Sequence, residues 1–164
     1  MMNLDIIKTI VIVLLTAVVL GVLQVLGIFD TKYIGPQSTL DKLSDEFFKQ
    51  CKTYPTLQEF MNDTFLIYSE KFSYIIIQDL EANITNKIRK KYHIPDNIDL
   101  TPEQQQEIDD LLNSILLTRV RPCVINPLVS KYKTCENIHN NFSPFLTDFI
   151  STVIDCVNQV KQNL

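Results

Sequence analysis

Hydrophobic residues form an unbroken run near the start of the chain. Residues 9–29 read TIVIVLLTAVVLGVLQVLGIF and carry no charge between Lys8 and Asp30. A helix of this length rises about 31 Å, which matches the hydrocarbon core of a bilayer. The run therefore predicts a transmembrane anchor within residues 1–29. The competing interpretation is a cleaved signal peptide, but its apolar region is normally shorter, and the small-x-small cleavage site is poorly matched.

The flanks of this run encode its orientation weakly. Lys8 precedes it, and Lys32 follows it close to Asp30. Positive residues favour the cytosolic side, so we expect a cytosolic N-terminus with the C-terminal domain on the opposite side of the membrane. Inside the run, Ala17 and Gly21 form a small-xxx-small pair that lets two such helices approach closely. Two small residues at this spacing also arise by chance.

Beyond a linker predicted at residues 30–37, apolar residues recur every three or four positions. This spacing predicts helices that each bury one face. The first predicted helix covers residues 39–52, and the second starts after Pro55 and is stopped by Pro95. Three further helices are predicted. Thr101-Pro102 and Ser143-Pro144 are the start signals of two of them, and the one between them is indicated by the apolar spacing of Leu128, Tyr132, Cys135 and Ile138.

The apolar face of the second predicted helix changes direction at residues 73–78. Either the helix breaks there, or Tyr74–Ile77 is buried on all sides; a short strand is a further alternative, because these residues favour it. Every proline is expected to fall between helices rather than inside one. In particular, Pro122 and Pro127 are expected to bracket a kinked connection. The pattern as a whole predicts an all-α domain of five or six helices over residues 38–164.

Four cysteines follow the apolar run, and none has the CxxC spacing of a zinc or iron–sulfur site. The four positions are Cys51, Cys123, Cys135 and Cys156. An even number behind a membrane anchor favours two disulfides in an oxidising compartment. Three pairings exist, and a hairpin of the last two helices favours Cys123–Cys156 with Cys51–Cys135. The alternative is four free, buried thiols.

Two N-glycosylation sequons give weak further support for an oxidising compartment. They are Asn62-Asp63-Thr64 and Asn83-Ile84-Thr85, and both asparagines lie off the predicted apolar faces. A third, at Asn141, is weakened by the proline that follows it.

Composition and charge exclude several function classes. The formal net charge is −4, which argues against nucleic-acid binding. No glycine follows Gly35, which excludes Gly-rich phosphate loops and Gly-containing nucleophile elbows in the rest of the chain. His93 and His139 have no partners at metal-ligand spacing. We therefore expect no enzyme activity, cofactor or metal. A basic run at residues 87–91 is interpreted as a favourable helix end, with contact to lipid headgroups or an acidic partner as the alternative.

The residue usage is biased. Ile numbers 20 against 19 Leu, Lys 12 against 3 Arg, Asn numbers 12, and Trp is absent. With the segment MMNLDIIKTIVIVLLTAVVLGVLQVLGIF and the positions of the four cysteines, the chain resembles the small virion membrane proteins of nucleocytoplasmic large DNA viruses. These include subunits of entry and fusion complexes and minor capsid components. The resemblance implies a virion membrane, with the N-terminus toward the virion interior.

The sequence thus predicts a single-pass, membrane-tethered structural or interaction protein. Its expected partners are the bilayer and other membrane or capsid proteins, and a homo-oligomer is an additional expectation. Two alternatives stay open. One is a membrane-anchored enzyme whose acidic residues converge only in three dimensions, and the other is a secreted helical effector released by cleavage.

Overall fold

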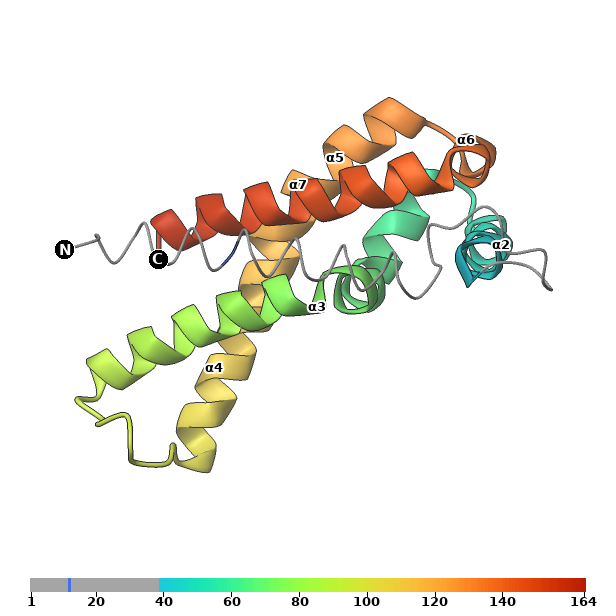
Figure 1. Ribbon diagram of the computed structural model, residues 1–164. Coiled ribbons are helices and arrows are strands. Elements are labelled where there is room, and N and C mark those ends of the chain that lie inside the picture. The colour runs from blue at the N-terminus through green and yellow to red at the C-terminus, as the bar shows by residue number, and fades with distance from the viewer. Residues whose placement is uncertain (1–11, 13–38) are drawn as a thin grey trace. The chain divides into compact units, whose positions relative to one another are not determined.

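The computed structural model describes Ile12 and residues 39–164, and every regular element within those residues is helical (Figure 1). The elements are α2 (Thr39–Cys51), α3 (Leu57–Lys91), α4 (Pro102–Ile115), the π-helix η1 (Leu116–Val120), α5 (Arg121–Tyr132), α6 (Cys135–Asn140) and α7 (Phe142–Gln162). The all-helical class predicted from the apolar spacing is therefore confirmed for this part of the chain.

The chain divides into two units, with the boundary between Glu46 and Phe47 inside α2. The unit from Phe47 to Leu164 contains the core. The predicted transmembrane run, with Ala17 and Gly21, and the linker at 30–37 fall outside the described residues, apart from Ile12. Among the helices that are described, none combines the length and the apolar character needed to cross a bilayer.

An aromatic cluster joins the end of α2 to α3 and α7. The Phe47 ring is buried and lies 4.9 Å from Phe60, 5.0 Å from Tyr68 and 5.3 Å from Phe145, measured between ring centroids. Phe145 in turn packs edge-on against Tyr132 of α5. Edge-to-face aromatic pairs add about 0.5–1.5 kcal/mol each beyond the area they bury. This cluster therefore ties four helices together at one end of the unit.

Helix α3 begins just after Pro55, as predicted, and bends in its middle. The Thr56 hydroxyl oxygen accepts a hydrogen bond from the Glu59 backbone N–H at 3.2 Å. Ser73 leaves helical geometry at φ −135° and ψ 29°, and the ribbon changes direction there (Figure 1). Tyr74 and Ile75 are exposed. The break was therefore the correct alternative, and burial on all sides and a strand were both wrong.

The expectation that every proline lies between helices was wrong for Pro122 and Pro127. The helical path runs without interruption from α4 through η1 to α5, and Pro127 lies inside α5. Pro122 follows directly after η1, where the Arg121 N–H donates to the Leu116 carbonyl, so the proline replaces an N–H within a continuous helical path. The wide turn of η1 just before it leaves more room for the proline ring. Pro127 removes the N–H that an α-helix would donate to the Cys123 carbonyl, and its ring crowds the same carbonyl.

One helix predicted near residues 128–138 is two helices, because the chain reverses at Lys133. This residue has φ 68° and ψ −38°, and the Thr134 N–H donates to the Tyr132 carbonyl at 2.8 Å across it. The geometry is a γ-turn with positive φ, which is strained for a residue with a Cβ. His93, after α3, also has a positive φ of 54°. Because no glycine follows Gly35, both turns use a residue that has a side chain.

We predict that Lys133→Gly stabilises the protein. Removing the Cβ relieves the strain at positive φ, and part of that gain is offset by the greater freedom of glycine in the unfolded chain. The expected gain in unfolding free energy is about 0.5–1 kcal/mol, measured by urea denaturation followed by circular dichroism. Lys133→Ala is the control and should change little, since it keeps the Cβ. Equal stabilities for the Gly and Ala variants would contradict the strain at this position.

Candidate functional site

Two disulfides cross-link the helices, and their pairing is the one that the hairpin argument favoured. Cys51 at the end of α2 is bonded to Cys135 at the start of α6, and Cys123 of α5 is bonded to Cys156 of α7. The Cα atoms are 6.0 Å apart in both pairs, which is an ordinary disulfide separation. No described cysteine is free, so the alternative of four buried thiols is wrong.

A surface cavity of about 340 Å³ lies beside the Cys51–Cys135 bond. The Lys52 ammonium and the Glu136 carboxylate both line it and form an ion pair at 2.5 Å. Both side chains are about half exposed, so the pair contributes at most about 1 kcal/mol. This region is therefore a solvent-exposed contact between α2 and α6.

Most of the charged side chains in the basic run at residues 87–91 have hydrogen-bond or ion-pair partners within the fold. Lys87 donates to the backbone carbonyl of Leu164, and Lys91 pairs with Glu107 of α4 at 2.6 Å. The Arg89 guanidinium donates to the carbonyl oxygens of Pro95 and Ile98 at 2.9 and 2.8 Å. Three of the four charges thus hold the α3–α4 connection and the C-terminus of the chain.

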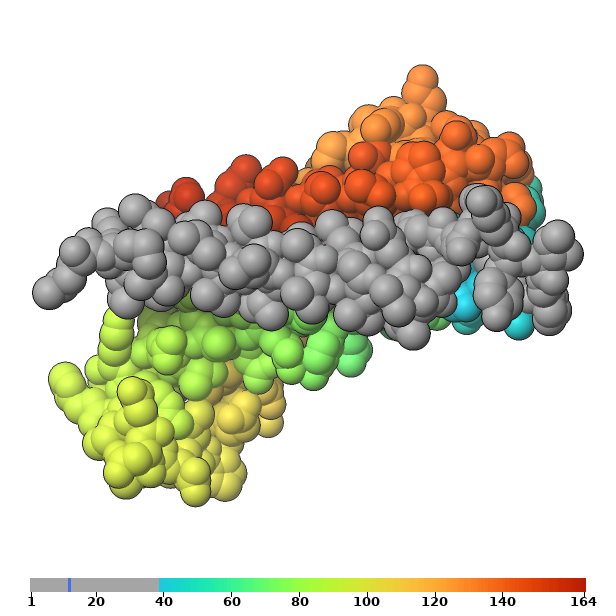
Figure 2. All heavy atoms as spheres, in the orientation of Figure 1, coloured from blue at the N-terminus to red at the C-terminus, as the bar shows by residue number. Residues whose placement is uncertain are grey.

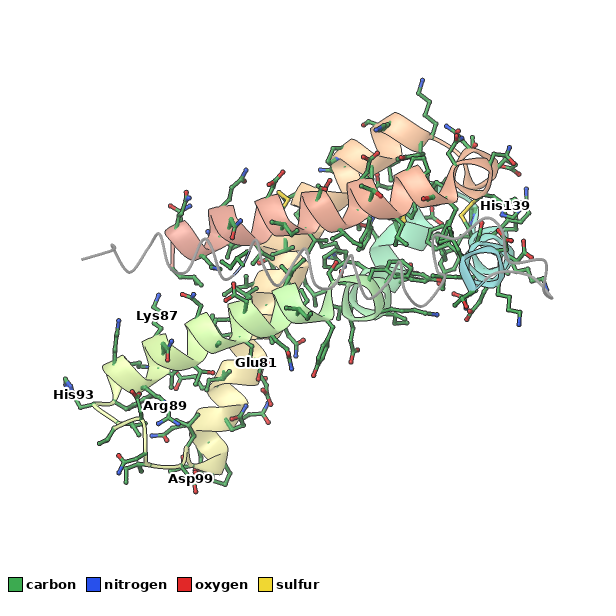
Figure 3. The ribbon with its side chains drawn as sticks, viewed as in Figure 1. Glu81, Lys87, Arg89, His93, Asp99 and His139 are labelled. Atoms are coloured by element: carbon green, nitrogen blue, oxygen red, sulfur yellow. A yellow bond between two sulfur atoms is a disulfide. The ribbon has the colours of Figure 1, made fainter. Side chains whose placement is uncertain are left out.

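A second open cavity, of about 390 Å³, lies at this end of α3. The α3–α4 connection is exposed at the surface of the molecule (Figure 2). His93 and Asp96 both line the cavity, together with Lys90. His93 projects outward from the end of α3, whereas His139 lies at the other end of the bundle and stacks on Phe48 at 4.5 Å (Figure 3). The lining side chains of this cavity are mostly exposed, so it offers no water-excluded centre for catalysis.

A polar cluster joins α5 to α7. The Tyr132 hydroxyl donates to Asp148 Oδ2 at 2.6 Å, and the Lys131 ammonium donates to the same oxygen at 2.5 Å. These two donors, Lys131 first, lower the pKa of the Asp148 carboxyl below its usual value. Burial, followed by the hydrogen bond to Asp148, raises the pKa of Tyr132. The cluster fixes the packing of the two helices that Cys123–Cys156 also joins.

The two sequons both lie on α3, in different surroundings. Asn83 is exposed, whereas Asn62 is half-buried. The hydroxyl of Thr64, which completes the first sequon, is buried and donates to the Phe60 carbonyl at 2.6 Å. Of these two asparagines, Asn83 is therefore the one that is well presented to solvent in the folded domain.

The sequence reasoning missed an apolar surface on α3. Four side chains, Leu66, Ile67, Tyr74 and Ile75, are exposed there, on either side of the bend. Elsewhere in the described residues the exposed large apolar side chains are Tyr92, Ile98 and Ile12. The signal was in the sequence, because two apolar pairs fall outside the stripe that continues through Leu57, Phe65 and Phe72. Exposed large apolar side chains concentrated on one helix make that helix a candidate interaction surface.

The described residues contain no group of three histidines, cysteines or acidic residues placed to hold a metal ion. Comparison with known proteins gives no matching family model, no similar curated protein and no similar solved structure.

We predict that each disulfide contributes substantially to stability. The bonds span 84 and 33 residues of sequence. In the chain-entropy model, loops of these lengths are worth about 4.5 and about 4 kcal/mol. Cys51→Ser/Cys135→Ser and Cys123→Ser/Cys156→Ser should each lower the free energy of unfolding by about 2–5 kcal/mol in urea titrations.

Alkylation provides the control for this prediction. The wild-type protein, denatured without reductant, should take up no thiol label, and after reduction it should take up four labels. Labelling before reduction would show that the cysteines are not paired.

The Asp148 cluster predicts a pH dependence of stability. The pKa of this carboxyl is lower in the folded protein than in the unfolded chain, so its contribution is present above about pH 4 and is lost as the pH falls below that value. Asp148→Asn should therefore make the urea midpoint fall less steeply between about pH 4 and pH 2. Asp155→Asn, an exposed carboxylate on the same helix, is the control. If the urea midpoint of Asp148→Asn fell as steeply with falling pH as that of the wild type, the lowered pKa of Asp148 would not be the cause of the acid destabilisation.

Proposed function

We propose that this chain is a non-enzymatic, membrane-tethered interaction protein and a component of a multiprotein membrane complex. The exposed apolar surface of α3 carries the proposal, because a domain whose other helices bury their apolar faces presents it to solvent. The uncharged run at residues 9–29 supports the tether. The two disulfides support an oxidising environment for the helical domain. A virion membrane is the setting that the overall resemblance implies.

Rigidity supports the same proposal. Two disulfides and the Phe47 aromatic cluster hold the helices in place, so α3 is presented on a preorganised scaffold. Preorganisation lowers the entropy lost on binding and so improves affinity. A small rigid domain on a membrane anchor suits assembly with neighbouring proteins in the same membrane.

Extraction and affinity purification of the tagged full-length chain test the two parts of the proposal. We expect the protein to stay in the membrane pellet in alkaline carbonate and to co-purify with a defined partner in mild detergent. Ile75→Glu on α3 should reduce the recovered partner about tenfold. The matched control is Ile98→Glu, an exposed isoleucine on the α3–α4 connection, which should leave recovery unchanged.

Each part can fail separately. Complete release by carbonate would overturn the tether. A lone monomer with no co-purifying chain, including no second copy of itself, would overturn the interaction role.

A further inference from the structure

The surface cavity of about 340 Å³ gives access to the Cys51–Cys135 disulfide. Both cysteines line this cavity, and its other walls are the α2–α3 connection and the turn between α5 and α6. Cys135 is partly exposed, whereas Cys51 is fully buried. A cavity of this volume admits a small molecule. Such a molecule would therefore meet the Cys135 side of the bond.

The charged side chains that line the cavity favour an anion. Lys52 and Lys133 are both part of its wall, against the single carboxylate of Glu136. Glu136 is already paired with Lys52. Lys133 is exposed and forms no ion pair with any residue that the structure describes. Because its charge is not neutralised, Lys133 raises the local concentration of anions beside the disulfide.

The two disulfides also differ in where their cysteines lie along the helices. Cys51 is the last residue of α2 and Cys135 is the first residue of α6, whereas Cys123 and Cys156 lie within α5 and α7. Helix ends open locally at little cost, so sulfur atoms there can separate once the bond is cleaved. Thiols held inside two packed helices stay side by side, and the bond between them re-forms before a second thiol arrives.

We propose that Cys51–Cys135 is a redox-sensitive bond that exchanges with a small anionic thiol bound in this cavity. The thiolate of the small molecule attacks Cys135 Sγ, and the bond between the two cysteine sulfurs breaks. The electron pair stays on Cys51 Sγ, which takes a proton from water, and the small molecule remains on Cys135 as a mixed disulfide. A second molecule of the thiol then attacks the sulfur of the first. It releases the Cys135 thiolate, so one protein disulfide is reduced and two small thiols are oxidised to their own disulfide.

Cleavage of this bond would loosen α6 and leave the rest of the domain closed. Helix α6 has only six residues, and its other contacts with α2 are the Lys52–Glu136 ion pair and the stacking of His139 on Phe48 at 4.5 Å. The aromatic cluster around Phe47 joins α2 to α3 and α7 without α6. The Cys123–Cys156 bond still links α5 to α7. The exchange is therefore a local switch at one end of the domain, and it does not depend on the proposed interaction role.

The first test follows the order in which the bonds are reduced. The folded full-length chain in mild detergent is treated with mercaptosuccinate, a small thiol that carries carboxylates. Free thiols are alkylated at successive times, and the labelled positions are identified by peptide mass spectrometry. Cys51 should be labelled first, with the small thiol attached to Cys135. Cys123 and Cys156 should be labelled about tenfold more slowly or less, and they are the internal control.

The second test removes the charge at the cavity. Lys133→Gln keeps the Cβ and should slow reduction by mercaptosuccinate about threefold, because one attraction to the anion is lost. Its rate of reduction by the neutral thiol 2-mercaptoethanol should equal that of the wild type. Lys90→Gln changes an exposed lysine near the end of α3 and should alter neither rate. The unfolding midpoint of each variant verifies that the domain is intact.

Three results would overturn the inference. One is reduction of Cys123–Cys156 before Cys51–Cys135 or at the same rate. Another is a mixed disulfide on Cys51 in place of Cys135. The last is a Lys133→Gln variant that mercaptosuccinate reduces as fast as the wild type, or one that both thiols reduce more slowly by the same factor.

Discussion

The packing of the described domain depends on the buried ring of Phe47. It is the point where the end of α2 contacts aromatic residues of α3 and α7, with centroid distances of 4.9–5.7 Å. One helical turn later, Cys51 is bonded to Cys135, so the aromatic contact and the covalent bond act on the same stretch of α2. Together they fix where α3 starts and where α6 follows α5. The exposed face of α3 has a defined position within the domain only because its other face is held in this way.

Much of the helical fold was predictable because each helix carries its own local signal. The signals after Pro55 and at Thr101-Pro102 predicted the correct starts of α3 and α4, and the Thr101 capping box is complete in both directions. The path through Pro122 and Pro127 was not predictable, because the π-turn that makes room for a proline has no residue signature of its own. The reversal at Lys133 was missed for a related reason, since turns with positive φ are normally recognised by glycine and none follows Gly35.

The candidate surface was harder to predict than the fold. Periodicity identifies a buried face, but it does not say whether apolar residues outside that face are covered by another element. Ile67 and Ile75 differ from Ile84 only in what packs over them. The basic run shows the opposite problem. Lys87, Arg89 and Lys91 have the composition of a binding patch, yet the structure uses them to hold Leu164, the α3–α4 connection and α4.

The Cys51–Cys135 bond also affects how the chain responds to proteases. It joins a residue before the α3–α4 connection to a residue after it, and that connection carries exposed side chains such as Tyr92, His93 and Ile98. Exposed connections are the preferred sites of proteolytic cleavage. A cut between residues 92 and 101 would give two polypeptides that stay covalently joined. The C-terminal piece would leave the N-terminal one only after both cleavage and reduction, so its release needs two independent chemical steps.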